Sequence, residues 1–248
     1  MAEIRGHYLF QVRSYECGAA GQATLASVCN YLQEAASLHA ESLEFSRSNF
    51  AAEGENISWV LTRLKVQMKR YPRWEEKVDV ETYPRGGRKI VAWRDFVLRS
   101  AETQEVLGVA TSEWMIINLA TRRIVAIPEI VFTIAKDLPA SEAVLGLEPF
   151  SLRLRFPESA AEKAEAEFTA LNAHIDLNGH VNNVHYIEWM MEPCPAKYPR
   201  EMEIVFRSET FAGEKVRVAI AAGAGEGETF HRVASVDGRD HILARTLL

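Results

Sequence analysis

The stretch that decides the fold is His174-Ile175-Asp176-Leu177-Asn178-Gly179-His180-Val181-Asn182-Asn183-Val184-His185-Tyr186-Ile187-Glu188-Trp189. Gly179 permits a tight turn near its middle. Beyond this glycine, apolar residues recur at spacings of three, three and four, the pattern of an amphipathic helix. Asn182 or Asn183 is placed to cap the start of this helix, and Pro193 to end it. The stretch therefore predicts a turn followed by a short helix with one buried face.

Three polar side chains precede this helix. Asp176, Asn178 and His180 recur at every second residue, so in extended backbone all three face one cleft. The free N–H groups and the dipole of a helix start favour developing negative charge. A carboxylate, a carboxamide and an imidazole gathered there form an arrangement for attacking a carbonyl. The structural alternative is that Asx residues here only cap the helix or close a turn.

A metal site is the weaker interpretation of the same stretch. It would use His174, His180 and His185, but the last two are five residues apart, which fits one helix face poorly. The stretch also contains no cysteine ligand. We therefore expect neither a metal ion nor another cofactor.

Composition indicates a soluble globular protein. Of the 248 residues, 48% are hydrophobic and 25% charged, and the net charge of -6 does not favour nucleic-acid binding. No apolar run approaches the ~20 residues needed to span a bilayer. The first residues, Met1–Arg5, lack a signal-peptide core and an Arg- and Ser-rich leader, so we expect a bacterial cytoplasmic protein. Three scattered cysteines, Cys17, Cys29 and Cys194, favour reduced thiols over a disulfide framework.

The chain in order predicts one helix followed by antiparallel strands, and then the same pattern again. The first part combines a strand over 7–12, a long helix over 22–43 and a hairpin turn at Gly86-Gly87. Its other strands are expected over 57–83 (two strands broken near Pro72), 89–99, 106–117 and 123–127. The second part has strands over 168–175, 201–208, 214–221, 229–236 and 241–247, with the helix of the opening stretch after the first of them.

A linker separates the two parts. Residues 128–157 contain four prolines and no sustained periodicity. We expect an N-terminal domain over 1–135, a linker over 136–157 and a C-terminal domain over 158–248. A local match between Glu76–Val80 and Glu214–Val218 supports the repeat.

The repeat provides a test of the polar residues. Alignment by hand pairs Tyr186 with Tyr31 and sets Thr210 opposite Pro72. The residues opposite Asp176, Asn178, His180 and Glu209 are then Gly21, Ala23, Leu25 and Tyr71. A capping or folding role would have been kept in both copies, so the asymmetry favours a function located in the second.

The chain also resembles a known family. The pattern Asp-x-Asn-x-His-Val-Asn-Asn-x-x-Tyr over Asp176–Tyr186 resembles the signature of the acyl-acyl carrier protein thioesterases. Further matches follow the family's order and spacing at Asn30–Glu34, Trp74–Val80, Arg94–Phe96, Thr111–Trp114 and Thr121–Arg123. The resemblance implies an α+β tandem hot-dog fold, in which each of two antiparallel sheets wraps around a long helix. The two sheets could join edge to edge as one continuous sheet.

The resemblance also implies a reaction: hydrolysis of fatty acyl-carrier-protein thioesters to free fatty acid, which terminates fatty acid synthesis. The C-terminal half would be catalytic, and the first half would supply the acyl-chain pocket. Glu209 takes the place of the family's catalytic glutamate. Many relatives carry a cysteine directly after that glutamate, but Thr210 stands here, so we expect no cysteine nucleophile.

The expected mechanism uses activated water. Glu209 or Asp176 would be the base, Asn178 would orient the water or the carbonyl, and His180 would share in proton transfer. An oxyanion would be received by backbone N–H groups at the start of the helix. The candidates for these groups are Val181, Asn182 and Asn183.

The expected partner is acyl carrier protein, with the acyl chain on its 4′-phosphopantetheine. Because that protein is acidic, a basic docking patch is expected, although charges in turns are more often simply solvated. The candidates are Arg70, Arg73, Arg85, Arg88, Lys89 and Arg94. A homodimer is possible. The alternatives are a hot-dog acyl-CoA thioesterase, a hot-dog dehydratase and a non-catalytic acyl-binding module.

Overall fold

The computed structural model describes residues 4–136, 150, 153–157 and 166–248. The chain divides into two compact units. The first comprises Met1–Ala23 and Asn30–Glu148, and the second Thr24–Cys29 and Pro149–Leu248. Most of the linker expected over 136–157 lies outside the described residues. Within the described part of the chain, no helix combines the length and apolar character needed to cross a membrane.

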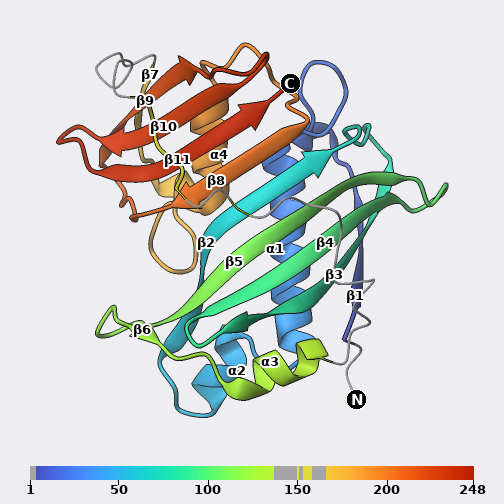
Figure 1. Cartoon of the computed structure of the whole chain (residues 1–248), viewed down its shortest axis with the longest axis vertical. Helices are drawn as coiled ribbons and strands as arrows, with labels where there is room; N and C mark the ends of the chain where they lie inside the picture. The colour runs from blue at the N-terminus through green and yellow to red at the C-terminus, as the bar shows by residue number, and fades with distance from the viewer. Residues whose placement is uncertain (1–3, 137–149, 151–152, 158–165) are drawn as a thin grey trace. The chain divides into compact units, whose positions relative to one another are not determined.

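The first unit is an antiparallel sheet with a long helix against one face (Figure 1). Its strands lie in the order β1-β3-β4-β5-β2, and β6 pairs with β5. The elements are β1 (Gly6–Gln11), α1 (Leu25–Ser42), α2 (Arg47–Ala52), β2 (Ile57–Met68), β3 (Lys77–Arg88), β4 (Val91–Ser100), β5 (Val106–Asn118), β6 (Ile124–Val125) and α3 (Glu129–Lys136).

Helix α1 packs through one apolar stripe, whose residues recur at spacings of three and four and are at most 5% exposed. The stripe consists of Leu25, Val28, Cys29, Leu32, Ala35 and Ala36. The ring of Tyr31 stacks on Phe10 of β1 with 5.0 Å between centroids. Nearer the end of the helix, Arg94 of β4 donates a hydrogen bond of 2.8 Å to His39 Nδ1. Helix α1 is therefore held against the sheet through β1 and β4.

One prediction about the first unit is wrong. Gly86 and Gly87 lie inside β3, opposite Trp93 and Ala92, and the chain reverses at Lys89 and Ile90 instead. A bulge between Pro84 and Gly86 explains the glycines, because it shifts the register and leaves both at positive φ. The sequence predicted no element for the last part of this domain, where the helix α3 forms and its Val131 joins a core cluster with Ile116 and Ile127.

The second unit repeats this architecture with a shorter helix. Its sheet has the order β8-β11-β10-β9-β7, and α4 packs against β9 and β10 (Figure 1). The elements are β7 (Ala166–Thr169), a short 3-10 turn (Asn172–His174), α4 (Asn183–Met191), β8 (Glu201–Phe206), β9 (Lys215–Ala222), β10 (Thr229–Ser235) and β11 (Asp240–Leu247).

Alternation along the strands accounts for the core of the second unit. Val216 and Val218 of β9 and Ile242 of β11 are fully buried, while Lys215 and Arg217 are exposed. On the helix side, Trp189 of α4 stacks on Phe168 of β7 with 5.9 Å between centroids. Burial of alternate strand residues against one helix therefore builds each unit.

Candidate active site

The polar stretch before α4 forms a closed turn. The Asp176 N–H donates to the His180 carbonyl at 2.8 Å, and the Gly179 N–H donates to the Asp176 carbonyl at 3.0 Å. Ile175 and Val181 on either side form an antiparallel bridge. Gly179 has φ +82°, a conformation that other residues rarely adopt. The prediction of extended backbone from Asp176 to His180 is therefore wrong, because the chain reverses direction within this stretch.

Asp176 and Asn178 are paired inside this turn. One oxygen of the Asp176 carboxylate accepts from the Asn178 N–H at 2.8 Å, and the other accepts from Asn178 Nδ2 at 3.3 Å. This is the Asx turn that the structural alternative anticipated. The same contacts hold the Asn178 carboxamide in a defined orientation.

A backbone hydrogen bond next to His180 brings its side chain into contact with that of Glu209. The Val181 N–H donates to the Thr210 carbonyl at 2.9 Å, which holds the end of the turn against the segment after β8. The flanking side chains therefore lie together, with His180 Nε2 3.4 Å from Glu209 Oε2. The His180 side chain is 16% exposed and that of Glu209 36%, so this pair remains open to water. The edge-on ring of Phe211 packs against His180 at 5.2 Å.

The helix start is capped as predicted. Asn182 Oδ1 accepts a hydrogen bond of 3.0 Å from the Val184 N–H. Two of the three candidate oxyanion donors are already engaged, because the Val181 N–H donates to Thr210 and the Asn182 N–H to the His174 carbonyl at 2.9 Å. Asn183 is the first residue of α4, where an N–H has no acceptor within the helix. Of the three candidate donors, the Asn183 N–H is therefore the one that these hydrogen bonds leave available to an oxyanion.

The same turn recurs in the first unit, with the same hydrogen bonds. The Gly18 N–H donates to the Gln22 carbonyl at 2.9 Å, and the Gly21 N–H donates to the Gly18 carbonyl at 2.9 Å. The Ala23 N–H donates to the Pro72 carbonyl at 2.8 Å, as Val181 does to Thr210. These bonds equate Asp176 with Gly18, Asn178 with Ala20, His180 with Gln22 and Thr210 with Pro72.

This register shows that the hand alignment was wrong for the helix motif and right for the segment of Thr210. Pairing Tyr186 with Tyr31 set the helix motif three residues away from the register in which the hydrogen bonds of the two turns coincide. The pairing of Thr210 with Pro72 was right, and it leaves Tyr71 in the place of Glu209. Since the first copy closes its turn with Gly18, a carboxylate is not required to close it.

A buried polar group lies behind Glu209, and the sequence analysis did not single it out. Its members are the half-buried Ser208 and the buried Thr210, Tyr186 of α4 and His241 of β11. The ring centroids of Tyr186 and His241 are 6.2 Å apart. Burial raises the pKa of Tyr186 to about 12 and lowers the pKa of His241 below its ordinary value. Tyr186 ends the family motif, but no local motif marks Ser208 or His241, because the group is assembled from three separate segments.

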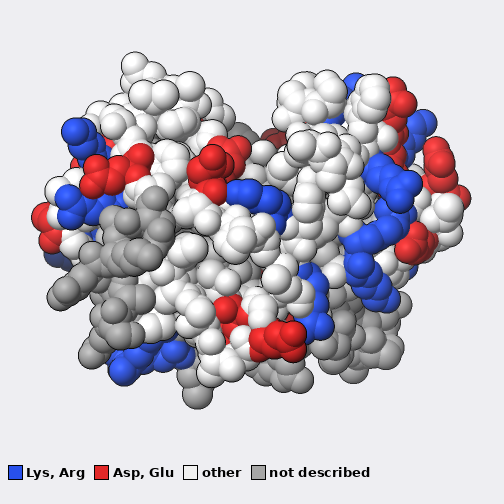
Figure 2. Space-filling model, turned by 90° about the horizontal axis from the view of Figure 1, so that it is seen from above, with Lys and Arg blue, Asp and Glu red and all other residues white. Residues whose placement is uncertain are grey.

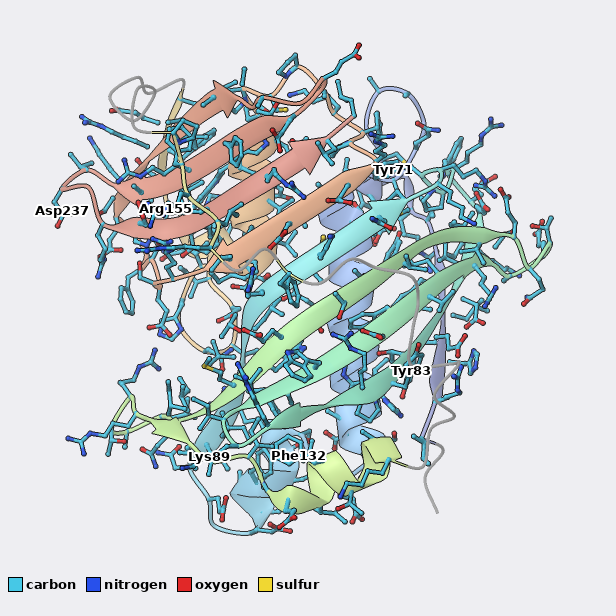
Figure 3. All side chains as sticks on the ribbon, viewed as in Figure 1. Tyr71, Tyr83, Lys89, Phe132, Arg155 and Asp237 are labelled. Atoms are coloured by element: carbon cyan, nitrogen blue, oxygen red, sulfur yellow. The ribbon has the colours of Figure 1, made fainter. Side chains whose placement is uncertain are left out.

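The cations predicted to form one docking patch are spread along the first unit. Arg70 and Arg73 precede β3, whereas Arg88 and Lys89 lie at its far end, and this strand is 12 residues long. At 3.3 Å per residue, the two groups are about 40 Å apart. Figure 3 shows Tyr71 and Lys89 at opposite ends of this sheet.

Three of the six cations are engaged in pairs. Arg70 contacts Glu76 and Glu105, each at 2.8 Å, and Arg85 lies 3.3 Å from Asp95. Arg94 points inward to His39, as described for α1. On the face drawn in Figure 2, Lys and Arg side chains are interspersed with Asp and Glu. The structure thus does not bring the six residues together as one surface.

The histidines of the opening stretch do not converge on a common point. His174 and His185 lie side by side with 4.6 Å between ring centroids, and His185 Nδ1 contacts Glu188 at 2.6 Å. His180 contacts Glu209 instead. Among the described residues, no group of three or more His, Cys, Asp or Glu side chains has an arrangement that could hold a metal ion.

Solved structures of similar fold cover nearly the whole chain. An acyl-ACP thioesterase from Bacteroides thetaiotaomicron superimposes with a TM-score of 0.85 and 24% identity, covering 98% of this chain and 97% of that one. The 12:0-ACP thioesterase of Umbellularia californica gives a TM-score of 0.78 and 24% identity, covering 99% and 94%. This likeness confirms the tandem hot-dog fold.

Sequence comparison identifies the family. The chloroplastic palmitoyl-acyl carrier protein thioesterase of Gossypium hirsutum is 33% identical over 257 residues, which cover 96% of this chain and 62% of the relative. The oleoyl enzyme of Coriandrum sativum is 32% identical, covering 94% of this chain and 69% of the relative. The chain thus spans about two thirds of the length of these relatives. The family models for the N- and C-terminal domains of acyl-ACP thioesterases match residues 7–134 and 157–248. This chain therefore belongs to the acyl-ACP thioesterase family.

Proposed function

We propose that this chain hydrolyses fatty acyl-acyl carrier protein thioesters to free fatty acid and carrier protein. The observation that carries the proposal is the contact of His180 with Glu209, which stands only in the second of two otherwise matching turns. An acid and an imidazole in contact, half open to water and close to a helix start, suit attack by water on a carbonyl. Family membership supplies the substrate class.

Glu209 is the better candidate for the base. Both Asp176 oxygens accept hydrogen bonds from Asn178, whereas Glu209 lies against His180, which can share the proton. Asp176 then orients Asn178, whose carboxamide would direct the water or the acyl carbonyl. The leaving thiol, with a pKa of about 8–9, needs little acid assistance. We assign the oxyanion to the Asn183 N–H.

A cysteine nucleophile is not part of the proposal. Cys29 and Cys194 are buried, and burial raises the pKa of each thiol. Cys17 is half-buried on the first unit, and burial together with the neighbouring Glu16 raises its pKa as well. A raised pKa disfavours the thiolate that a nucleophile requires.

The remaining assignments are proposals of the same kind. The domain limits and a bacterial cytoplasmic setting are inferences from the sequence, an acyl-chain pocket in the first unit is what the family resemblance implies, and a homodimer is a further hypothesis. Among the predicted docking cations, Arg73 before the start of β3 and Arg88 and Lys89 at its far end are exposed, so either end of this strand could separately meet an acidic carrier protein. Light scattering on the purified protein would test the dimer.

The testing experiment is thiol release from a panel of acyl carrier protein and CoA thioesters, saturated and unsaturated. The variants are Glu209→Gln and Asp176→Asn. Loss of a general base costs about 10²–10⁴-fold in rate. We expect a loss in this range for Glu209→Gln and a smaller loss for Asp176→Asn, because Asn178 then loses its orienting carboxylate.

The outcomes separate the alternatives. Release from carrier-protein thioesters that is lost in Glu209→Gln would support the proposal and also identify the acyl length. Release only from CoA thioesters would make the chain an acyl-CoA thioesterase. Acyl binding without thiol release would show that the chain is a non-catalytic acyl-binding module. A decrease in kcat of less than tenfold in Glu209→Gln would exclude Glu209 as the general base.

A further inference from the structure

Glu209 stands on a backbone segment that is fixed on both sides. On the C-terminal side, the Thr210 carbonyl accepts from the Val181 N–H at 2.9 Å. On the N-terminal side, the Arg207 N–H donates to the His241 carbonyl at 2.8 Å, where β8 leaves the sheet beside β11. The first attachment brings His180 to Glu209, and the second runs through a residue with no role in the proposed chemistry.

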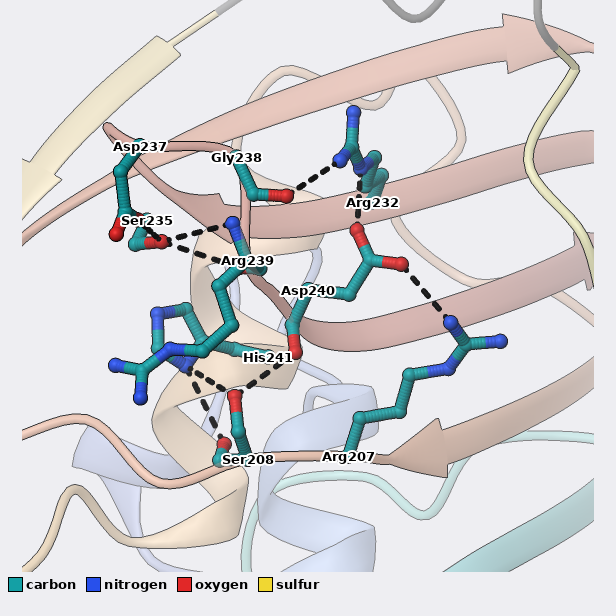
Figure 4. A network of polar contacts seen from close by, with 9 residues as sticks. All are labelled: Arg207, Ser208, Arg232, Ser235, Asp237, Gly238, Arg239, Asp240 and His241. Atoms are coloured by element: carbon teal, nitrogen blue, oxygen red, sulfur yellow. Dashed lines mark hydrogen bonds and ion pairs between the residues drawn. The ribbon is translucent and has the colours of Figure 1, made fainter.

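The His241 side chain adds to this second attachment. Ser208 Oγ lies 2.8 Å from the Asp240 carbonyl and 3.0 Å from His241 Nδ1, which is also 3.3 Å from the Ser208 carbonyl (Figure 4). A carbonyl can only accept, so the single Ser208 hydroxyl proton goes to Asp240. His241 Nδ1 must then carry a proton and donate it to Ser208. The imidazole therefore holds both the side chain and the carbonyl of the residue before Glu209.

This tautomer leaves His241 Nε2 as a buried acceptor. His241 is 0% exposed, and Nε2 has no hydrogen-bond partner among the described residues. Around it lie the buried hydroxyls of Tyr186 and Thr210, which interact with each other. A buried acceptor without a partner is disfavoured in a fold, so the Nε2 atom of His241 indicates that this imidazole is kept for a reason other than stability.

We propose that His241, acting through Ser208, is a positioning residue for Glu209. The proposal rests on the proposed function, in which Glu209 is the base. The neutral imidazole holds the backbone from Arg207 to Thr210 so that the Glu209 carboxylate stays 3.4 Å from His180. Burial disfavours the charged form of His241, which keeps Nε2 unprotonated and the tautomer fixed.

The chain offers a matched control in His231 of β10. His231 is also 0% exposed, and its ring bonds Thr246 Oγ1 at 2.8 Å and the Met190 carbonyl at 3.2 Å. These contacts join β10 to β11 and to the end of α4, away from the segment of Glu209. Replacing either imidazole by leucine removes the same group from an equally buried position. Only the change at His241 should disturb the base.

The first readout is the split between kcat and KM on an acyl carrier protein thioester, at a temperature where circular dichroism shows every variant folded. Misplacing a catalytic group by about 1 Å costs up to about 100-fold in rate, so we expect His241→Leu to lower kcat about 10- to 100-fold with KM unchanged. His231→Leu should keep kcat within about threefold. His241→Asn, whose amide N–H₂ replaces Nδ1–H, should recover most of the rate.

The second readout tests whether His241 acts through Glu209. In a Glu209→Gln background, adding His241→Leu should change kcat by less than about twofold, because residues that act as one unit are not additive. A full additional loss would overturn the proposal. So would an equal fall in kcat for His231→Leu, or no recovery in His241→Asn, since either would indicate a merely structural effect.

The third readout is independent of activity. Hydrogen exchange at the amides of Val181, Arg207 and Ser208 should accelerate in His241→Leu and stay unchanged in His231→Leu. If the wild-type protein released no thiol while exchange responded in this way, the proposed function would fail and the positioning of the segment would stand. Unchanged exchange in His241→Leu would overturn the positioning, whatever the activity.

Discussion

The buried imidazole of His231 should make the second unit sensitive to acid. Burial lowers its pKa from 6.5 to about 4, although the bond to the Met190 carbonyl opposes the shift. That carbonyl takes the Nδ1 proton, so Nε2 accepts from the Thr246 hydroxyl. Protonation of Nε2 would break this bond and bury a charge. The folded protein therefore holds His231 neutral.

The sign and size of the effect follow from linkage. The unfolded chain binds this proton below pH 6.5 and the folded chain only below about pH 4, so stability falls as the pH falls between these values. Between pH 7 and pH 4.5 this group alone removes about 2 kcal/mol from the free energy of unfolding. Below about pH 4 the loss from this group levels off, because both states are then protonated.

The test compares wild type with His231→Asn, whose amide can still donate to Met190 but does not titrate. Urea unfolding at several values between pH 7 and pH 4.5 gives the free energy of unfolding of each protein. The variant should be less stable at pH 7, because Thr246 loses its partner, and the difference should shrink by about 2 kcal/mol at pH 4.5. Carboxylates titrate equally in both proteins and cancel. A difference that stays constant with pH would refute the assignment of a buried neutral imidazole.

Three further predictions concern the glycines of the two matching turns, the three cysteines and the N-terminal cap of α4. Gly179→Ala and Gly21→Ala both place a side chain at positive φ in open space, so each should destabilise the protein by about 1 kcal/mol in thermal unfolding, but only Gly179→Ala should lower kcat. Replacing Cys17, Cys29 and Cys194 together by serine or alanine should leave kcat within about twofold in the thiol-release assay, and a large loss would reinstate a thiol mechanism. Asn182→Ala removes the cap of α4 and should cost about 1 kcal/mol in urea unfolding, whereas Asn182→Asp should cost much less.

Local patterns in the sequence predicted most of the secondary structure. Alternation placed β1, β2, β5 and the strands that follow α4 within a few residues, and the 3-4 stripe placed α1 and α4. These predictions succeeded because burial on one face imposes a period that a single segment displays. The strand expected over 168–175 is wrong in its second half, because β7 ends at Thr169 and Asn172–His174 form a 3-10 turn. The turn at Gly86-Gly87 failed because a bulge, which depends on the neighbouring strand, used the glycines inside β3.

For the candidate site, too, the sequence predicted the residues and the structure was needed for their contacts. The sequence identified Asp176, Asn178, His180 and Glu209 from the motif, the family resemblance and the asymmetry of the repeat. It did not determine their contacts, because the hydrogen bond from Val181 to Thr210 joins segments about 30 residues apart, and no local period records such a bond. The register of the repeat likewise became clear only from the hydrogen bonds that close both turns.

His241 shows what only the tertiary structure decides. In the sequence it is one alternating residue of a strand, with nothing to distinguish it from His231. The packing of β11 beside the end of β8 places one imidazole against Ser208, and the packing of β10 under α4 places the other against Met190. Residue type and period are properties of the chain itself, whereas the partner of a buried polar atom depends on which strands become neighbours.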